Sequence, residues 1–344
     1  MSISKIGTHA FYAHPNLERA VVSAPVIEAN AFCNAAKLEV VDLTSNAADT
    51  IYENAFANCS ELTHLLIRSA TISTLLSTLA LYGTKIKLGD GGVYVPADLL
   101  SSYKSATNWS TIADNIFPIG EYPKTNFDTI SDSWATIFAN TNYATDYTVK
   151  DTKTLELTDG TKIKMDLAAI DTDLKSDNSG TAKMTWICHG IPFTHCMNAT
   201  SDTTDGWVGS EMRSYLISDI LSKIPTEIKS HIVSVKKSYR SKKPNDETLW
   251  SDDEIWIPSY KEVGFTNATY VESDGVTYPG LFTSGTTSEA KSTRIKYNTS
   301  YLAYHWWLRS AGGTSSFSQV FSTGNENNQY AKSEHGVVFG FCTD

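Results

Sequence analysis

The chain has 344 residues, of which 41% are hydrophobic and 19% are charged, and its formal net charge is −10. This length favours two domains, because a single hydrophobic core seldom grows so large. The acidic balance argues against nucleic acid and anionic membranes as partners, since both select basic surfaces.

The N-terminal residues carry no export or membrane signal. Residues 1–6 lack the apolar stretch and cleavage site of a secretory peptide. No apolar run in the chain approaches the roughly 20 residues that a membrane span needs. We therefore expect a chain that is synthesised in the cytoplasm without a signal peptide and that does not enter a membrane.

An internal repeat occupies the N-terminal part. The segment Ile6–Phe11 recurs as Ile27–Phe32 and again as Ile51–Phe56, with starts 21 and 24 residues apart. These spacings lie within the range of leucine-rich repeats, in which each unit is buried only by stacking on the next one. We expect a short solenoid that ends with a strand at Val93–Pro96 and a helix within Leu99–Trp109. Each copy also has a leucine six residues after its phenylalanine: Leu17, Leu38 and Leu62.

The repeat resembles the BspA-type leucine-rich repeats. Asn58-Cys59-Ser60-Glu61-Leu62 follows the pattern of that family, and Cys33 stands two positions earlier in its own copy. This resemblance implies that both cysteines are small buried fillers. No pair among the five cysteines has C-x-x-C spacing, which argues against a disulfide framework or a structural zinc site. The remaining three are Cys188, Cys196 and Cys342.

A linker separates the repeats from the rest of the chain. The segment 119–125 has the proline and glycine of a connecting segment. Ser131 and Asp132 then precede apolar residues at helical spacing, which predicts a new helix with one of them as its cap. We place the domain boundary near residue 122, so that the repeat domain spans 1–121 and the second domain spans 122–344.

The second domain mixes strands and helices and is predicted to be α+β. Alternating residues on either side of Asp159-Gly160 predict a hairpin, and a helix is expected to begin at the cap Ser210 and to stop before Pro225. Two charged segments, 171–180 and 236–243, are interpreted as solvated. Further predictions are a strand at Glu254–Pro258, a loop over 266–300 and one terminal strand at Gly336–Cys342.

The C-terminal motifs resemble those of a known family. His305–Ser310, then Val320 with Gly324, then Gly336–Phe341 resemble the ending of a domain of unknown function, the family numbered 6273, common in gut bacterial and phage proteins. Further matches upstream extend the resemblance over about residues 124–344, and this set of motifs is specific. It implies a C-type-lectin-like architecture of the formylglycine-generating-enzyme type.

Several proteins with this ending are targets of diversity-generating retroelements, which rewrite codons of a C-terminal segment. Residues 301–336 show the pattern expected of such a segment, because scaffold residues such as Trp306 alternate with residues whose side chains have no chemical property in common. Tyrosine and histidine beside small polar residues make an adaptable binding surface. The competing interpretation is a polar surface loop without a ligand. The predicted ligand-binding residues are Tyr304, His305, Thr314, Ser316, Gln319, Phe321, Thr323, Asn325, Asn327, Asn328, Tyr330 and His335. At least one of Trp306 and Trp307 is expected in the core.

Catalytic or metal chemistry is not expected. Cys188, His189, His195 and Cys196 offer four soft ligands, but their spacing fits no usual zinc arrangement. The cysteine pair that binds copper in formylglycine-generating enzymes is not reproduced either, and no calcium loop is present. We therefore expect no cofactor, no metal and no enzymatic activity.

These patterns favour a non-enzymatic ligand- or receptor-binding protein, associated with the tail of a phage or prophage. The expected partners are a host cell-surface protein or glycan and other tail proteins, with a homo-oligomer, such as the trimer usual in tail fibres, as the assembly. The expected location is the virion or the extracellular surface. Two alternatives stay open: a bacterial cell-surface adhesin without diversification, and a metal-dependent oxidase on the same fold.

Overall fold

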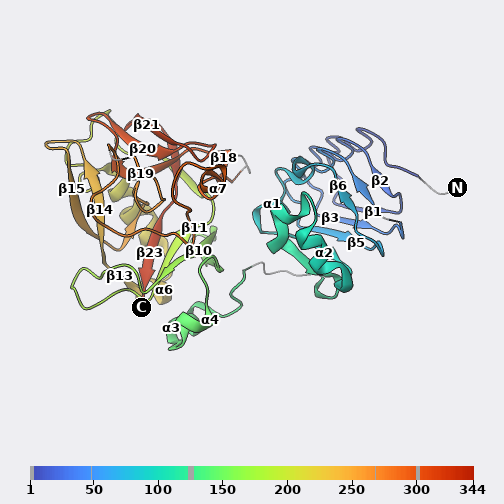
Figure 1. Cartoon of the computed structure of the whole chain (residues 1–344), viewed down its shortest axis with the longest axis horizontal. Coiled ribbons are helices and arrows are strands. Elements are labelled where there is room, and N and C mark those ends of the chain that lie inside the picture. Colours follow the sequence, from blue (N-terminus) through green and yellow to red (C-terminus); the bar gives the residue numbers. More distant parts are fainter. Residues whose placement is uncertain (1–3, 48, 123–127, 268, 300–302) are drawn as a thin grey trace. The chain divides into compact units, whose positions relative to one another are not determined.

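The computed structural model describes residues 4–47, 49–122, 128–267, 269–299 and 303–344 (Figure 1). These residues form two compact units, and the second comprises Asp128–Thr299 and Ala303–Asp344. We call them the repeat unit and the C-terminal unit. The predicted boundary near 122 lies just before residues 123–127, which are outside the described residues, as are 301 and 302 of the predicted variable segment. Within the described ranges, no helix is both long and apolar enough to cross a membrane.

The repeat unit contains two ladders of parallel strands. Arg19 pairs with Val40, and Val40 pairs with His64, so the register advances by the same 21 and 24 residues as the sequence repeat. The larger ladder follows the order β1 (Arg19–Val22), β3 (Val40–Leu43), β5 (His64–Ile67), β7 (Gly92–Val95) and β8 (Ile116–Pro118). The smaller contains β2 (Val26–Ile27), β4 (Thr50–Ile51) and β6 (Thr74–Leu75).

The repeated phenylalanines stack on one another in the turns that connect a strand of the smaller ladder to the next strand of the larger ladder. The ring of Phe32 lies 5.0 Å from that of Phe11 and 5.3 Å from that of Phe56, measured between centroids, and both pairs are nearly parallel. The turns also repeat a left-handed backbone conformation, which asparagine tolerates better than most residues. The repeated asparagines at φ between 55° and 63° are Asn30, Asn34, Asn54 and Asn58.

A fourth copy and a helical segment close the repeat unit. Phe56 N–H donates to the carbonyl of Ala80 at 2.9 Å, as Phe32 N–H does to Ala55, so Ala80 and Leu81 stand where the motif has alanine and phenylalanine. The predicted helix within Leu99–Trp109 is confirmed as α2 (Leu100–Ser105). The other short helices are η1 (Thr78–Leu81), α1 (Lys85–Leu88), η2 (Ala97–Leu99), η3 (Trp109–Asn115) and η4 (Ile119–Glu121).

The helical segment is tied to the strands by two aromatic side chains. The indole N–H of Trp109 donates to the carbonyl of Ser73 at 2.8 Å, and the Tyr103 hydroxyl accepts from the backbone N–H of the same serine at 2.8 Å. Both rings are buried. Cys33 and Cys59 are buried as well, as the resemblance implies.

The central sheet of the C-terminal unit is built around the predicted hairpin, which is confirmed. Gly160, in the turn, has φ +85°, a value that favours glycine. The strand order is β13 (Ile232–Val233), β23 (Gly340–Thr343), β11 (Met184–Cys188), β10 (Lys162–Ile170) and β9 (Thr152–Glu156), and β16 (Ile255–Trp256) also pairs with β23.

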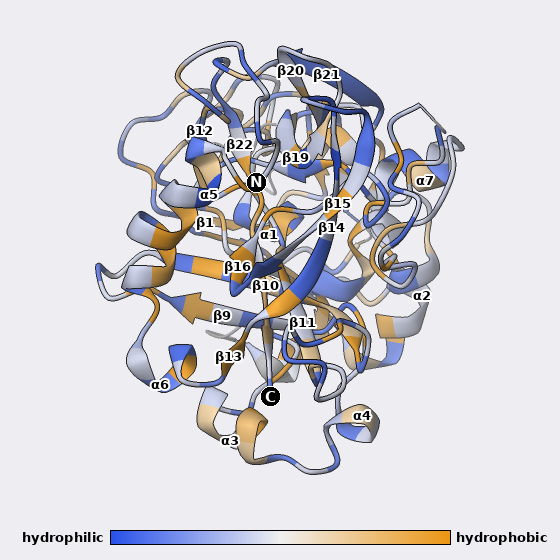
Figure 2. Cartoon of the chain, turned by 90° about the vertical axis from the view of Figure 1, so that its left-hand side faces the viewer, coloured by the Kyte–Doolittle hydropathy of each residue, from blue (hydrophilic) through white to orange (hydrophobic). Residues whose placement is uncertain are grey.

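A second sheet carries most of the predicted binding residues, and we call it the display sheet. Its order is β12 (Phe193–His195), β22 (His335–Val337), β19 (Trp306–Ala311), β20 (Ser316–Val320) and β21 (Glu326–Tyr330). In Figure 2 the β20–β21 hairpin is mainly hydrophilic. Two further pairs complete the unit: β14 (Val235–Ser241) with β15 (Glu247–Asp253), and β17 (Lys296–Tyr297) with β18 (Ala303–Tyr304).

The prediction of a single terminal strand at Gly336–Cys342 is wrong. The chain leaves the display sheet after β22 and enters the central sheet as β23. Gly340 allows this crossing, because a Cβ there would lie 2.7 Å from both the Trp186 carbonyl oxygen and the Trp256 ring.

The helices of the C-terminal unit are short. The helix predicted after Ser131 and Asp132 forms as α3 (Trp134–Ala139), but Ser133 is its cap. Ser210 caps α5 (Glu211–Tyr215) as predicted, and the helix continues as η5 (Leu216–Ile220) and η6 (Leu221–Lys223). The loop predicted over 266–300 contains α7 (Ser288–Ser292) and β17. The remaining helices are α4 (Tyr143–Asp146) and α6 (Thr226–Lys229).

Both charged segments interpreted as solvated contribute to the core, so those interpretations are wrong. Asp173 is 0% exposed and Lys237 is 1% exposed. Their charges compensate each other, since Lys237 Nζ lies 2.5 Å from Asp173 Oδ1. The Tyr278 hydroxyl bonds the same carboxylate at 3.0 Å. Charge patterning along the sequence does not reveal a pair whose members are 64 residues apart.

Candidate functional site

The display sheet is held by a buried strand. In β19, Trp306, Trp307, Leu308 and Arg309 are all 0% exposed. The indole N–H of Trp307 donates to the His195 carbonyl at 2.9 Å, and that of Trp306 donates to the Arg294 carbonyl at 3.1 Å. Both tryptophans therefore belong to the core and are bonded in place, and neither is available to grip a ligand.

Arg309 joins this strand to a buried network of charges. Its guanidinium donates to both carboxylate oxygens of Glu262, at 2.6 and 2.9 Å. Lys237 Nζ lies 3.2 Å from the same carboxylate. Burial by itself would raise the pKa of Glu262, but the cations of Arg309 and Lys237 outweigh that effect and bring the pKa down to about 2. The framework under the display sheet is thus an ion pair network without solvent contact.

The predicted binding residues do not share one surface. Trp307, Gln319 and Asn327 lie side by side across the sheet on one face, and Val320 and Glu326 pair on the other. Because side chains alternate along a strand, neighbours in the sequence point to opposite faces. The expectation of a single solvent-facing surface is wrong for this reason. Ser316, Asn328 and Tyr330 share the face of Glu326, whereas Gln319, Asn327 and His335 share the face of Trp307.

Exposure separates the predicted residues further. Tyr330 is 57% exposed and Phe321 is 36% exposed. Gln319 is 0% exposed, and both polar atoms of its amide lack a hydrogen-bond partner within the described residues. It cannot contact a ligand as placed, because none of it is exposed to solvent, and its assignment to the binding surface is wrong. Thr314, Thr323 and Asn327 are exposed, and Tyr304, His305, Ser316, Asn325, Asn328 and His335 are half-buried.

Two histidines and a phenylalanine meet at one end of the sheet. The His305 ring lies 4.1 Å from the Phe321 ring and 5.6 Å from the His335 ring, measured between centroids. Neither ring nitrogen of His335 has a hydrogen-bond partner within the described part of the chain. Burial, followed by the charge of His305, lowers the pKa of His335 to about 4. This side chain is therefore neutral near neutral pH.

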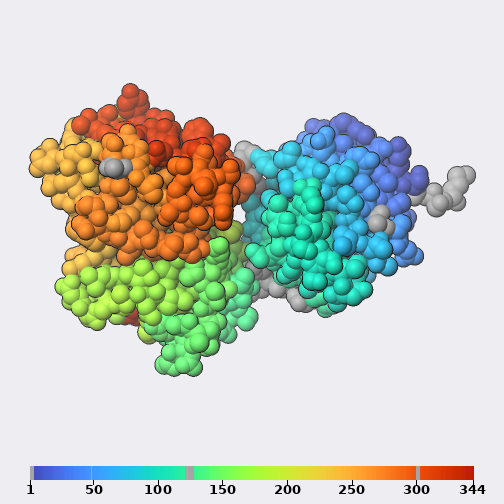
Figure 3. All heavy atoms as spheres, in the orientation of Figure 1, coloured from blue at the N-terminus to red at the C-terminus, as the bar shows by residue number. Residues whose placement is uncertain are grey.

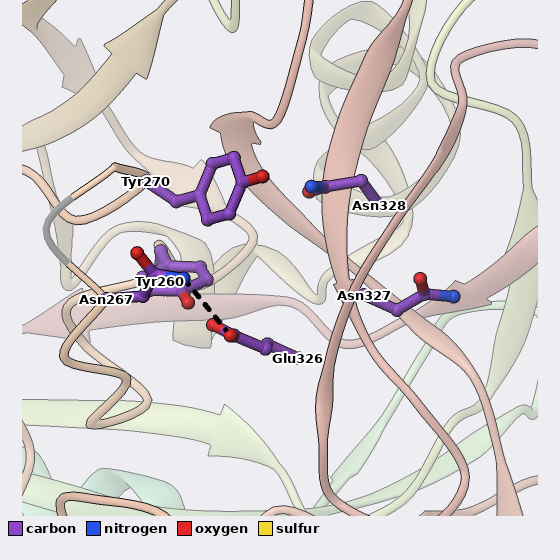
Figure 4. Close-up of a pocket in the computed structure, with 6 residues that line it drawn as sticks. All are labelled: Tyr260, Asn267, Tyr270, Glu326, Asn327 and Asn328. Atoms are coloured by element: carbon purple, nitrogen blue, oxygen red, sulfur yellow. Dashed lines mark hydrogen bonds between the residues drawn. The ribbon is translucent and has the colours of Figure 1, made fainter.

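A pocket of about 310 Å³ lies beside the edge strand β21 (Figure 4). Asn267 donates from its amide to Glu326 Oε1 at 3.2 Å. Figure 4 shows the Tyr270 hydroxyl and the Asn328 amide directed toward each other across the pocket, whereas Asn327 points away. The complete lining is Tyr260, Asn267, Tyr270, Glu326, Asn327 and Asn328.

The sequence predicted only two of these six residues, Asn327 and Asn328. Tyr260, Asn267 and Tyr270 belong to a segment without periodicity or motif, and only the tertiary structure brings it to β21. Tyr260 is 1% exposed, and its hydroxyl has no hydrogen-bond partner among the described residues. Burial raises the pKa of Glu326. The pocket thus combines aromatic rings, amides and one partly desolvated carboxylate.

The soft ligands considered for metal or nucleophilic chemistry are engaged separately. Cys188 is buried, and burial raises its pKa to about 12, so its reactive thiolate form is suppressed. His189 Nδ1 lies 2.6 Å from Asp166 Oδ1, whereas the His195 ring stacks on Tyr215 at 4.2 Å. No group of three or more histidine, cysteine or acidic side chains that could hold a metal occurs within the described ranges.

Comparison with known families agrees with both resemblances. Residues 1–87 match the family model described as BspA type Leucine rich repeat region (6 copies). Residues 194–341 match Domain of unknown function (DUF6273), a narrower range than the expected 124–344. No curated protein and no solved structure matches the chain. The chain therefore combines BspA-type leucine-rich repeats at its N-terminus with a DUF6273 domain at its C-terminus.

Proposed function

We propose that the chain is a non-enzymatic ligand-binding protein whose binding surface is the β20–β21 hairpin together with the adjoining pocket. One observation carries this proposal: exposed Tyr330 and Phe321 project from a hairpin whose neighbouring strand is wholly buried. Binding residues typically lie on loops and edges that a rigid scaffold positions. Figure 3 displays residues of this C-terminal segment, in red, on the surface of the C-terminal unit.

The composition of the hairpin supports this role. Exposed tyrosine offers a large contact area at a small loss of side-chain entropy, and asparagine and serine offer adaptable hydrogen bonds. Tyr330, Asn327, Asn328 and Tyr270 supply both kinds of group around the pocket. Tyr330 and Asn327 are exposed, so these two side chains can differ without loss of the fold.

We extend the proposal to the architecture. The repeat unit is a short solenoid, supported by the 21- and 24-residue advance of its parallel strands. The C-terminal unit has a C-type-lectin-like fold, supported by its mixed α+β structure with two sheets and by the resemblance of its ending. In this arrangement the solenoid serves as a spacer or attachment module for the binding unit.

The biological role that follows is receptor binding by a phage or prophage tail protein, with a host cell-surface protein or glycan as partner. The segment around the hairpin is proposed to be varied by a diversity-generating retroelement. The coding DNA tests that part: an adenine-rich near-copy of codons 300–336 beside a reverse transcriptase gene is expected. A neighbourhood that lacks both would leave an adhesin without diversification.

Binding itself is tested with the full chain, labelled and applied to a panel of bacterial cells and to a glycan array. The double variant Tyr330→Ala, Phe321→Ala is expected to lose binding by about thirtyfold or more, the effect of removing dominant contact residues. Its melting temperature should stay close to that of the wild type. The matched control is Tyr52→Ala, which removes a tyrosine that is 40% exposed in the repeat unit. Unchanged binding by the double variant contradicts the proposal.

A further inference from the structure

Some backbone N–H and C=O groups of the edge strand β21 point away from the display sheet. Phe321 N–H donates to the Asn325 carbonyl at 2.8 Å, and Ala331 N–H donates to the Ser315 carbonyl at 3.1 Å. Hydrogen-bonded and non-hydrogen-bonded pairs alternate in an antiparallel ladder. With these two bonds fixing the register, the backbone N–H and C=O groups of Glu326 and Asn328 point away from β20.

These backbone groups have no hydrogen-bond partner within the described residues. The strand carries no lysine, proline or bulge, three of the features with which proteins protect an edge. Its sequence is Glu326-Asn327-Asn328-Gln329-Tyr330, and its register with β20 is unbroken. The edge is therefore regular enough to accept another strand.

The pocket lies along this edge. It is lined by three consecutive residues of β21, Glu326, Asn327 and Asn328. Consecutive side chains point to opposite faces, so a pocket that touches all three must lie beside the strand and not over one face. A strand added to β21 would pass this pocket and could place one of its side chains there.

The charge of the pocket indicates which side chain that is. Glu326 is bonded by the neutral amide of Asn267, and no cation accompanies it within the described residues. The Lys242 ammonium lies 5.8 Å from the Tyr270 ring centroid, but it is already bonded to Asp246 at 2.7 Å. A carboxylate beside two tyrosine rings suits a cation, which both the charge and the ring faces attract.

We propose that β21 binds an extended segment of a partner protein as an added strand, with an arginine or lysine side chain of that segment in the pocket. The net charge of −10 favours the approach of a basic segment. The facing groups of Tyr270 and Asn328 supply the polar contacts around that cation. This inference rests on the proposed function and names the chemical class of its ligand.

The test uses the full chain as bait for a displayed library of random ten-residue peptides, with a glycan array in parallel. The selected peptides are expected to share one arginine or lysine. The tightest is then synthesised with citrulline or norleucine at that position, and also as a series in which each backbone nitrogen in turn is methylated. Affinities are measured by fluorescence anisotropy.

Three results are expected. The neutral replacement weakens binding about tenfold or more, as does Glu326→Gln in the protein, because each removes one member of a charge-assisted contact. Glu227→Gln, an exposed glutamate on α6, leaves the affinity unchanged. Methylation weakens binding at every second position of the peptide, since only alternate N–H groups of an added strand face β21.

The other outcomes overturn the inference. Peptides that bind without a cation, or that tolerate methylation at all positions, exclude strand addition at this pocket. Binding only on the glycan array excludes a polypeptide ligand. The proposed function survives these results as long as Tyr330→Ala, Phe321→Ala still abolishes binding to cells, so the failures of the two proposals are distinguishable.

Discussion

Arg309 and Glu262 form a two-pronged ion pair inside the C-terminal unit, with N–O distances of 2.6 and 2.9 Å and almost no exposure of either side chain. Arg309 also donates to the Ser238 and Ile257 carbonyls, at 2.9 and 2.7 Å. It therefore connects β19 of the display sheet to β14 and to the segment after β16. The position of the candidate binding surface depends on this buried contact.

Replacing Glu262 by glutamine is expected to destabilise the C-terminal unit by about 3–5 kcal/mol, because buried Arg309 loses its carboxylate partner and Lys237 keeps only Asp173. Urea unfolding followed by tryptophan fluorescence measures this, since seven of the eight tryptophans lie in that unit. The matched control is Glu156→Gln, which breaks a Lys162–Glu156 pair that is 67% and 58% exposed. A change of at most about 1 kcal/mol is expected there. Equal effects of the two variants would contradict the argument.

His335 should make the stability of the C-terminal unit depend on pH between about 6.5 and 4. Its pKa is lowered in the folded chain from 6.5 to about 4, so in this window the unfolded chain binds a proton that the folded chain does not. Stability is therefore fully present above pH 6.5 and falls as the pH drops toward 4. His335→Gln is expected to flatten this part of the profile of urea midpoint against pH. The exposed His14 provides the control, and a profile that His335→Gln leaves unchanged would refute the prediction.

The free energy lost on replacing a phenylalanine of the stack by alanine should depend on its position in the stack. Phe32 is 0% exposed between two rings, whereas Phe11 ends the stack and is 37% exposed. Phe32→Ala is expected to cost about 3–5 kcal/mol, the usual cost of a buried aromatic cavity, and Phe11→Ala clearly less. Hydrogen exchange of the amides of β3 and β5, measured by mass spectrometry, reports this. Similar loss of protection in both variants would mean that the stack does not organise the unit.

Gly324, in the turn of the β20–β21 hairpin, should resist substitution more than Gly160, which also has a positive φ. A Cβ there would lie 2.0 Å from the Lys291 carbonyl oxygen, at φ +77°. Gly160 has φ +85° but nothing within 4 Å, so Gly160→Ala carries only the backbone strain of about 1–2 kcal/mol. Gly324→Ala is expected to cost more and to displace the hairpin from α7. Thermal unfolding compares the two, and equal shifts in melting temperature would disprove the close approach.

Local sequence patterns were sufficient to predict the repeat unit. The alanine and phenylalanine positions of the repeat predicted stacked turns, and each such turn contacts only the next copy along the chain. The fourth copy escaped detection, because Leu75 and Leu81 replace the motif's isoleucine and phenylalanine while keeping the same contacts. The hairpin around Gly160 and the helix capped by Ser210 were predictable for the same reason, since their hydrogen bonds join residues that are close in the sequence.

The candidate site was only partly predictable. The sequence located the hairpin and its mixture of aromatic and amide residues, but it placed Gln319 at the surface and omitted Tyr260 and Tyr270. A strand pattern states that alternate residues face opposite ways. It does not state which face the rest of the chain covers, and here parts of both faces are buried.

By itself the sequence determined the repeat, its spacing, the two family resemblances and the identity of the segment that contains the hairpin. Only the tertiary structure decided that Lys237 and Asp173 lie in the core, that the terminal segment divides between two sheets, and that a pocket forms between Tyr270 and β21. The physical reason is the range of the interactions. Repeats and turns are determined by neighbours along the chain, whereas burial and charge compensation depend on partners tens of residues away.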